Sequence, residues 1–526
     1  MDPAVAIEQA ALKKHKAMNE ALERGDSEIQ QFYEGRVVLV TGGSGFLGKH
    51  LIEKLLRSCD IKKIYLLMRA KRNKSVNSRL HEILQDPVFD GLRQKRSNFD
   101  NPLVPLIGDV NTLGLGLDND DRRKITKEVE IIFHAAATTR FDETLRNATI
   151  TNVRGTREIL ALAKNCKKLR SFVYISTAYG FATKDNVKTC ILEQFYPSPI
   201  EPDTLINIAE SFNNKALEDV ALRLTKQWPN TYTFTKIVTE ELIRLTKEDL
   251  PICIVRPTIV IGSYSEPSPG WLDKSNVFGA SGILLGLGLG IIHVVLADRD
   301  IKIDLIPVDM VTNSIIAAGW KTSTRWLSGC KDTKIYTVSN SRNPCLWGIL
   351  NSYMKTDLRS IISPRAVWYC TAIETKYLQV AYLLTWLFHF IPAYFVDGVL
   401  SIIGKEPILN KVYNKAWKIT SVLSHFTTNE WIFTDKNTME LYQSLCRTDQ
   451  DIFAFDSKVI NWKEMLLIWG VGLRKYILRD GLKDTNASMK KQFWLKMLNY
   501  IVLAVYIFIW WYIFVFVYWI LKFDFN

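Results

Sequence analysis

The feature that most constrains this chain is a glycine-rich turn between an apolar run and a helical pattern. Residues 37–40 read Val-Val-Leu-Val, which is typical of a short strand buried on both faces. Residues 46–56 return at helical spacing. A strand, a Gly-x-x-Gly-x-x-Gly turn and a helix in this order predict a dinucleotide site, and an ordinary surface turn is the alternative. The residues predicted to surround the pyrophosphate are Thr41, Gly42, Gly43, Ser44, Gly45, Phe46, Leu47 and Gly48.

The spaced glycines have separate predicted roles. Gly42 permits the tight turn, Gly45 lets the backbone approach a pyrophosphate, and Gly48 lets the helix pack closely on the strand. The first turn of the helix presents N–H groups and a positive dipole end, which suit a phosphate. The chain is therefore expected to form an α/β fold with a doubly wound parallel sheet of the Rossmann type.

Composition limits the class of protein. A chain of 526 residues is long enough for two or three domains. Hydrophobic residues make up 48%, which is high for a soluble enzyme, so some apolar surface is expected to face lipid. The net charge of +13 suits an anionic partner, either a phosphate-bearing ligand or the cytoplasmic face of a membrane. Nucleic acid is not expected, because no basic stripe or reader motif accompanies the charge.

The cysteines, the histidines and the N-terminus indicate a reducing compartment without a metal site. The eight cysteines form no Cys-x-x-Cys pair, which favours free thiols. His50 and Glu53 stand near each other, but no third ligand lies close in sequence. Residues 1–30 mix charges throughout and lack the apolar region of a signal peptide. We expect residues 1–32 to form a polar N-terminal arm, either helical or loose.

The residues after the second expected strand, 63–68, indicate the cofactor. An NAD-binding chain commonly carries Asp or Glu there for the ribose 2′-hydroxyl. This chain has Arg69, followed by Lys71, Arg72 and Lys74. Cations at this place could bind a 2′-phosphate, so NADPH is predicted, with Arg69 and Arg72 as its ligands. A solvated basic loop is the alternative.

Two further segments are expected to complete the adenine side of the site. Residues 78–96 carry an apolar stripe typical of an inserted helical segment. Residues 103–107 predict the third strand, and Asp109 and Val110 follow it. An Asp at that strand end commonly meets the adenine amino group in this fold, so both residues are predicted cofactor contacts.

The fourth expected strand, 131–137, ends in small residues. Ala135 and Ala136 would let the cofactor lie close over the strand. His134 is expected to be a packed strand residue rather than a ligand. Asn152 follows within a helical pattern and is another predicted cofactor contact.

A tyrosine and a lysine form the predicted catalytic pair. Tyr232 and Lys236 stand four residues apart, so they share one face of a helix. An ammonium beside a phenol stabilises the phenolate, which is expected to lower the pKa of Tyr232 toward working pH. Ser176 and Thr177 follow the fifth expected strand, 172–175, at the end where α/β sheets place their chemistry. We expect the hydroxyl of Thr177 or Ser176 to hold a substrate oxygen while Tyr232 supplies the proton.

These motifs, in this order, resemble the extended short-chain dehydrogenase/reductases. Several further stretches are similar to animal fatty acyl-CoA reductases and their C-terminal domain. These stretches are Ile64–Arg69, Arg79–Asp90, Ser176–Tyr179, Val255–Thr258, Glu266–Asp273, Pro307–Asp309, Phe453–Asp456, Asn461–Trp462 and Gly472–Tyr476. The resemblance covers about residues 30–480, its Pro-x-Pro-Gly-Trp segment is its most specific part, and it adds Pro257 to the expected cofactor contacts.

The resemblance implies an NADPH-dependent reduction of long-chain fatty acyl-CoA to a primary fatty alcohol and CoA, through an aldehyde. A membrane-bound NADP-dependent sterol or sugar-nucleotide dehydrogenase would share the Tyr232 and Lys236 pair, but it leaves the Pro-x-Pro-Gly-Trp segment unexplained. A membrane-tethered cofactor-binding scaffold would have tolerated loss of the catalytic pair. Extended reductases often pair through helix bundles, so a homodimer is among the expected assemblies.

One loop departs from the family pattern, and an apolar segment follows it. Residues 274–280 replace the Asn and Gly-Pro that the family usually has, near the expected acyl entrance, which bears on chain-length preference. Residues 279–296 are apolar and glycine-rich. They are expected to form either a core element, part of an acyl tunnel or a surface that touches the membrane.

Changes of composition predict the remaining domains. We expect the reductase domain to cover 33–330 and a mainly helical domain to cover 331–485. Within the latter, 377–396 is apolar, but Pro392 and Asp397 favour a helix that lies on or dips into the membrane over one that spans it.

The final segment, 486–526, is the predicted transmembrane anchor. Residues 497–521 exceed the length that crosses a bilayer and contain no Pro or Gly. Trp494 and Trp519 lie near the ends of this run, and the basic residues lie mainly before it. The positive-inside rule therefore keeps the catalytic domain cytosolic. The endoplasmic reticulum is the default compartment, with peroxisome or lipid droplet as alternatives.

Overall fold

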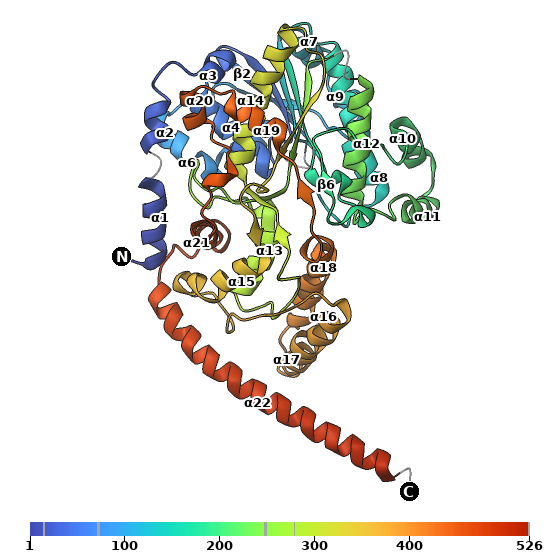
Figure 1. Ribbon diagram of the computed structural model, residues 1–526, viewed down its shortest axis with the longest axis vertical. Helices are drawn as coiled ribbons and strands as arrows, with labels where there is room; N and C mark the ends of the chain where they lie inside the picture. The colour runs from blue at the N-terminus through green and yellow to red at the C-terminus, as the bar shows by residue number, and fades with distance from the viewer. Residues whose placement is uncertain (14–15, 71–73, 247–249, 278, 524–526) are drawn as a thin grey trace.

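The computed structural model describes residues 1–13, 16–70, 74–246, 250–277 and 279–523. Its centre is a seven-stranded sheet in the order β12-β7-β5-β4-β1-β2-β3, in which every neighbouring pair is parallel (Figure 1). The strands are β1 (Val37–Thr41), β2 (Lys63–Met68), β3 (Leu103–Ile107), β4 (Ile131–His134), β5 (Ser171–Ile175), β7 (Ile252–Pro257) and β12 (Lys334–Val338). The prediction of a doubly wound parallel sheet is confirmed.

Helices cover both faces of the sheet, which explains why its strands are apolar throughout. Val38 and Val40 lie in one hydrophobic core cluster and Val37 and Leu39 in another, because successive side chains point to opposite faces. The helices of the first face are α3 (Glu28–Tyr33), α4 (Phe46–Ser58) and α14 (Val308–Leu327), and those of the second are α7 (Asn119–Glu128), α9 (Gly155–Lys164) and α12 (Thr231–Thr246).

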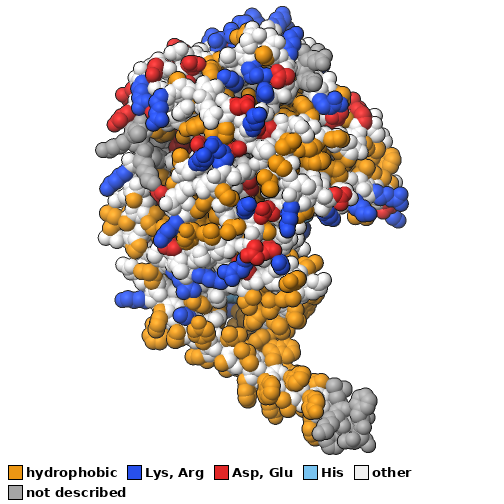
Figure 2. Space-filling model, in the orientation of Figure 1, with side chains coloured by type: hydrophobic (Ala, Val, Ile, Leu, Met, Phe, Trp, Pro, Cys, Tyr) orange, Lys and Arg blue, Asp and Glu red, His pale blue; other side chains and the backbone are white. Residues whose placement is uncertain are grey.

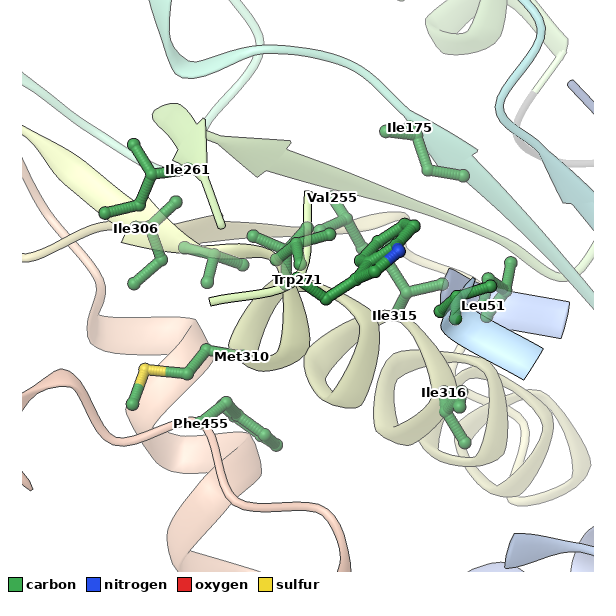
Figure 3. Close-up of a cluster of buried hydrophobic side chains, with 14 of the residues drawn as sticks. Leu51, Ile175, Val255, Ile261, Trp271, Ile306, Met310, Ile315, Ile316 and Phe455 are labelled. Carbon is green, nitrogen blue, oxygen red and sulfur yellow. The ribbon is translucent and has the colours of Figure 1, made fainter. Parts of the chain in front are cut away.

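The core of the first face is centred on a buried tryptophan. Figure 3 shows the indole of Trp271 among Val255 of the sheet, Ile315 of α14 and Leu51 of α4. Its side chain is fully buried, and its indole N–H donates to Asp86 at 3.0 Å. The Pro-x-Pro-Gly-Trp segment therefore packs into the reductase core.

The predicted elements are found with one change of boundary. The inserted segment after β2 is helical, as expected, and consists of α5 (Val76–Leu84), η1 (Pro87–Phe89) and α6 (Asp90–Lys95). The expected strand 131–137 is wrong at its end, because β4 stops at His134. The chain leaves the sheet there and passes the glycine turn, where the Ala135 N–H donates to the Thr41 carbonyl at 3.2 Å.

The second half of the chain is mainly helical and shares strands with the first half. The small strand pairs are β8 (Ile259–Ile261) with β11 (Leu305–Pro307), β9 (Val294–Leu296) with β14 (Ile373–Thr375), β6 (Cys190–Ile191) with β15 (Ile432–Phe433), and β10 (Lys302–Ile303) with β13 (Cys345–Leu346). Because β12 belongs to the main sheet, the sheet extends beyond the expected domain boundary at residue 330. The domain boundaries themselves stay predictions.

The helices that do not cover the main sheet fall into three groups along the chain. Before β7 lie α8 (Leu145–Ala148), α10 (Pro202–Ser211) and α11 (Asn214–Leu224), and after it lies α13 (Ala280–Gly288). The C-terminal half has α15 (Trp347–Lys355), η8 (Asp357–Ile361), α16 (Leu378–Thr385), η9 (Trp386–Phe390), α17 (Ile391–Ile402), α18 (Leu409–Thr427), α19 (Lys436–Gln443), α20 (Arg447–Ile452), α21 (Trp462–Gly472) and η11 (Leu473–Leu478). The N-terminal arm forms α1 (Pro3–Lys13) and α2 (Lys16–Ala21) before α3, and the Tyr33 hydroxyl at the end of α3 donates to the Ile316 carbonyl at 2.8 Å.

A long apolar helix, α22 (Thr485–Phe523), leaves the body and extends beneath it (Figure 1). Within the described residues, two helices are long and apolar enough to cross a membrane, namely Leu378–Ile402 and Thr485–Trp519. Figure 2 shows hydrophobic side chains covering α22 and the adjacent lower part of the body, whereas charged side chains are spread over the rest of this face.

Candidate active site

The glycine turn has the geometry of a phosphate cradle. Gly42 has a φ of +76°, and a Cβ there would lie 2.7 Å from the carbonyl carbon of Ala135. A Cβ at Gly48 would lie 2.2 Å from the Gly42 carbonyl oxygen, so only glycine lets α4 pack this closely. Gly45 is the N-cap of α4 and makes no side-chain cap, which leaves first-turn N–H groups to an external acceptor. These features fit a dinucleotide pyrophosphate.

A buried hydrogen-bond network supports the turn. The Thr41 hydroxyl accepts from the Ala136 N–H at 3.3 Å and is hydrogen-bonded to Nδ1 of His134 at 2.7 Å. Nε2 of His134 lies 2.9 Å from the Thr156 hydroxyl in α9. Burial lowers the pKa of His134 to about 3, so its ring is neutral. His134 is therefore a packed strand residue, as expected.

The other predicted cofactor contacts border the carboxyl ends of the strands. Arg69 is exposed directly after β2, and Arg72 lies outside the described residues. The Asp109 carboxylate accepts from the Asn111 N–H at 2.9 Å. Phe46 stacks on Trp271 at a ring-centroid distance of 5.2 Å. Three further predicted contacts also stand at strand ends. Val110 follows β3, Ala135 follows β4, and Pro257 is the last residue of β7.

Asn152 lies in an irregular helical turn. Residues 149–154 form a π-helix directly before α9, and such turns are frequent at functional sites. The Asn152 amide donates to the Thr235 hydroxyl at 2.9 Å and accepts from the Thr138 N–H at 2.9 Å. The wide turn thus places Asn152 between α12 and the segment after β4.

The structure brings Tyr232, Thr177 and Lys236 together at the carboxyl end of β5. The Thr177 hydroxyl lies within hydrogen-bonding reach of the Tyr232 hydroxyl. Nζ of Lys236 lies 6.0 Å from the centroid of the Tyr232 ring and donates to the Ile175 carbonyl at 2.7 Å and to the Tyr174 hydroxyl at 3.2 Å. The arrangement can hold an oxygen atom and protonate it.

The expected lowering of the Tyr232 pKa is wrong for the protein alone. Burial raises the pKa of Tyr232 to about 12, although the hydrogen bond from Thr177 acts in the opposite direction. Burial also lowers the pKa of Lys236 to about 7, against the attraction of the Glu240 carboxylate. The effect of desolvation on the pKa of Tyr232 therefore outweighs that of the Lys236 ammonium. This ammonium donates its hydrogen bonds to residues of β5 and not to the phenol.

The two candidate hydroxyls differ in their partners. Ser176 donates to the Glu240 carboxylate at 2.6 Å, and Glu240 is also paired with Arg256, whose Nε lies 3.0 Å away. Thr177 is thus the hydroxyl that contacts Tyr232, and Ser176 helps to hold the buried Glu240. Sequence reasoning missed Glu240, although its place four residues after Lys236 on the same helix face is a signal that could have found it.

The C-terminal half contributes a wall to the site. The ring centroid of Phe141 lies 6.1 Å from that of Tyr232 and 5.8 Å from that of Phe426 in α18. Lys418 of α18 donates to Asp142 at 2.8 Å. Asp142 and Lys418 are 276 residues apart in the sequence, and nothing local in the sequence predicts their contact.

An apolar pocket lies between α13, α15, η8 and α21. Leu284, Leu285, Leu287 and Leu289 line it, so part of the glycine-rich segment 279–296 faces a cavity. None of the four predicted catalytic residues belongs to its lining. Within the described ranges, no cluster of three His, Cys, Asp or Glu side chains could hold a metal ion.

Comparisons with known proteins agree with the resemblance. Family models described as male sterility protein match residues 40–315, an NAD-binding domain, and 388–480. The fatty acyl-CoA reductase wat of Drosophila melanogaster is 34% identical over 92% of this chain and 92% of its own length. Fatty acyl-CoA reductase 2 of Homo sapiens is 32% identical over 90% of this chain and 91% of its own length.

Solved structures share the fold. The terminal R domain from the myxalamid PKS-NRPS pathway has a TM-score of 0.57 at 19% identity, over 88% of this chain and 97% of that domain. The reductase domain of a non-ribosomal peptide synthetase from Mycobacterium tuberculosis has a TM-score of 0.55 at 17% identity, over 91% and 99%. These likenesses show the fold, and the NAD-binding family model indicates a nicotinamide cofactor. From the family models and from relatives matched over nine-tenths of their length, the chain belongs to the fatty acyl-CoA reductase family.

Proposed function

We propose that this protein reduces long-chain fatty acyl-CoA to a primary fatty alcohol and CoA, with NADPH as reductant and an aldehyde as intermediate. The observation that carries the proposal is the juxtaposition of the Tyr232 and Thr177 hydroxyls, with Lys236 beside them, at the end of β5. The names of the relatives supply the substrate class. A sterol or sugar-nucleotide dehydrogenase would not be expected to match these reductases over the C-terminal half, as this chain does.

The residues that would hold the cofactor surround the carboxyl edge of the sheet. The turn at 42–48 would bind the pyrophosphate through backbone N–H groups, and Arg69 and Arg72 would bind a 2′-phosphate. Lys236 and Asn152 would bind on the nicotinamide side, with the remaining predicted contacts around them. When bound, the cofactor supplies a hydride to the substrate carbonyl carbon.

The catalytic side chains act on the carbonyl oxygen. Thr177 and Tyr232 would both hydrogen-bond to this oxygen and stabilise the negative charge that develops on it. With a pKa of about 12, Tyr232 stays protonated at neutral pH and can transfer its proton to the oxyanion. With a pKa of about 7, Lys236 is charged in about half of the molecules at neutral pH, and its ammonium would stabilise the phenolate as the proton leaves.

The same groups can serve two reductions. The first gives a hemithioacetal, whose C–S bond breaks to release the CoA thiol and leave an aldehyde. The aldehyde carbonyl then takes the place of the thioester carbonyl and receives a second hydride and a proton. Two hydrides and two protons per thioester balance the formation of alcohol and thiol. The aromatic wall of Phe141 and Phe426 would keep water away from these steps.

The apolar helix α22 supports a membrane anchor, and its length and composition allow it to cross a bilayer. The basic residues before its apolar run support a cytosolic catalytic domain. The endoplasmic reticulum as compartment and the homodimer both stay predictions.

The test of this function is turnover by wild type and by Tyr232→Phe. Membranes bearing each protein are incubated with NADPH and a series of saturated acyl-CoAs, and the lipid products are identified. The wild type is expected to form alcohol at two NADPH per CoA, and Tyr232→Phe is expected to lose about 100-fold or more, because a positioned acid contributes 10²–10⁴-fold.

Two results would contradict the proposal. Wild-type-like turnover of Tyr232→Phe would remove the residue from the chemistry. No consumption of NADPH with any acyl-CoA would favour a sterol or sugar-nucleotide substrate.

The choice of NADPH predicts a cofactor-specific effect at Arg69. In Arg69→Ala the KM for NADPH is expected to rise about tenfold and the KM for NADH to stay unchanged, because only NADPH has the 2′-phosphate. Arg123→Ala is the control, since this exposed arginine pairs with Asp120 in α7. Equal changes for both cofactors would contradict the assignment.

A further inference from the structure

The helix made of α16, η9 and α17, residues 378–402, has two unlike sides. Its outer side is exposed and apolar, and Phe395 and Ile402 are 75% and 86% exposed. The exposed apolar residues of this side, here called the docking face, are Leu378, Val380, Tyr382, Leu383, Trp386, Tyr394, Phe395, Val396, Val399 and Ile402. A continuous apolar surface of this kind marks an interaction site.

The inner side carries the buried polar residues of this helix, Thr385, His389 and Asp397, and packs on the body, whereas Gln379 and Ser401 are exposed. His389 accepts from the His293 N–H at 2.9 Å and stacks on Tyr413 with ring centroids 4.7 Å apart. Asp397 accepts from the N–H groups of Leu409 and Asn410 at 3.0 and 2.9 Å, which caps α18. Protein therefore covers the inner side, and lipid cannot surround this helix as it surrounds a simple membrane span.

The apolar helix α22 runs beside the docking face. The Tyr506 hydroxyl donates to the Leu387 carbonyl at 2.7 Å, and the Tyr506 and Phe388 rings lie 6.4 Å apart. Nearer the start of α22, the Asn499 side chain accepts from the Trp368 indole at 2.8 Å. These contacts hold part of the apolar run of α22 against the body. Figure 1 shows α22 at the same end of the molecule as α16 and α17. A membrane that receives α22 necessarily reaches the docking face.

Charge at the border of the docking face suits a lipid surface. Lys405 and Lys411, which follow the helix, are exposed, with the exposed Glu406 beside Lys405, and Lys376, which precedes the helix, pairs with Asp298 at 3.4 Å. Basic residues at the edge of an apolar helical surface attract anionic headgroups.

We propose that the docking face lies in the leaflet that α22 enters, in the plane of the membrane and not across it. The partner is the lipid bilayer, and the body is thereby held at two places. The docked helix also contacts α18, where Tyr382 lies 5.9 Å from Trp417. Since Phe426, in the last turn of α18, lies beside the active site, docking would set the distance of that site from the lipid.

The direct test is photolabelling from within the bilayer. The full-length protein is reconstituted in vesicles of phosphatidylcholine and phosphatidylserine that contain a phospholipid with a diazirine in its acyl chain. After illumination, the labelled residues are located by mass spectrometry. Label is expected on Leu383, Phe395 and Ile402 as well as on α22, and not on His389 or Asp397. Label on α22 alone overturns the proposal.

Two other results would also overturn it. Label on both sides of residues 378–402 would mean that lipid surrounds the helix, which then spans. Absence of label combined with chemical cross-links between copies at Phe395 or Ile402 would mean that a second copy of the chain covers the docking face.

Two double variants that introduce negative charge provide the matched comparison. In the double variant Phe395→Glu with Ile402→Glu, labelling of 378–402 is expected to fall at least tenfold, while labelling of α22 is unchanged. Leu222→Glu with Leu327→Glu is the control, because these side chains are 75% and 72% exposed on other helices. Unchanged labelling in the first variant contradicts the proposal, and labelling of the wild type decides the question if that variant does not fold.

Discussion

At the residue scale, the candidate site depends on Tyr232 and Lys236, two groups whose charged forms burial disfavours. Lys236 is almost fully buried, and among the described residues its ammonium donates to the Ile175 carbonyl and the Tyr174 hydroxyl. The pKa of Lys236 falls to about 7 because the charged form loses hydration. A structural lysine at this place would be costly, so its presence supports a role in the chemistry.

This cost predicts how Lys236→Met changes stability with pH. The wild-type ammonium is destabilising in the folded state below pH 7, and that destabilisation is relieved as pH rises toward 10.5, the value in the unfolded chain. A tenfold difference in proton affinity is worth about 1.4 kcal/mol, so the stability gain of Lys236→Met should be on the order of 3 kcal/mol larger at pH 6 than at pH 9.

Thermal unfolding of both proteins without cofactor at the two pH values measures this difference. The hydrogen bonds that Met cannot make affect both measurements alike. A gain that is equal at pH 6 and pH 9 would mean that the folded lysine keeps its usual pKa. The variant should also lose activity.

At the element scale, the strand–turn–helix unit from β1 to α4 is built around close backbone approach. The Gly45 N-cap leaves N–H groups of α4 without a side-chain partner, and the Gly42 carbonyl occupies the space beside Gly48. A side chain in this turn would displace the backbone that is expected to bind the pyrophosphate.

Gly48→Ala is therefore expected to abolish cofactor binding and to lower stability by about 3 kcal/mol, because its Cβ would overlap the Gly42 carbonyl oxygen. Gly91→Ala in α6 is the matched control, since a Cβ there meets nothing within 4 Å. That control should be neutral or stabilise by about 0.5–1 kcal/mol. Calorimetric titration with NADPH and denaturant unfolding measure both effects. Equal behaviour of the two variants would contradict the close-packing argument.

At the scale of the whole molecule, the C-terminal half is part of one framework with the reductase sheet. Nζ of Lys54 in α4 donates to the Glu266 carboxylate at 2.7 Å and to the Ile452 carbonyl at 2.6 Å. Asn313 of α14 donates to Glu266 at 2.8 Å and to the Ala454 carbonyl at 2.9 Å. This buried cluster joins four separate parts of the sequence, and α18 completes the wall of the site.

Membrane attachment is a property of the whole molecule. A chain that ends at Lys496 keeps the packed start of α22 and loses its apolar run. It is expected to be released from membranes by alkaline carbonate, whereas the full chain stays bound, because only a spanning helix gives effectively irreversible insertion. Fractionation followed by immunoblotting measures this. Retention of the shortened chain in the carbonate pellet would place the principal anchor elsewhere.

Local patterns in the sequence determined much of this protein. The apolar run at 37–40, the glycine spacing and the four-residue interval from Tyr232 to Lys236 each depend on the geometry of one strand, one turn or one helix. Such features can be recognised without tertiary structure, because neighbouring residues determine them. The sheet, the position of the candidate site and the long apolar helix all followed from them.

Only the tertiary structure decided which side chains meet. It assigned Ser176 to Glu240 and Thr177 to Tyr232, and it brought Phe426 to the site from far along the chain. It also showed that His389 and Asp397 face the body, which an apolar pattern cannot reveal. The direction of the Tyr232 pKa likewise depended on burial. These properties arise from segments that are separate in the sequence and exclude water together in the fold, and no local spacing encodes them.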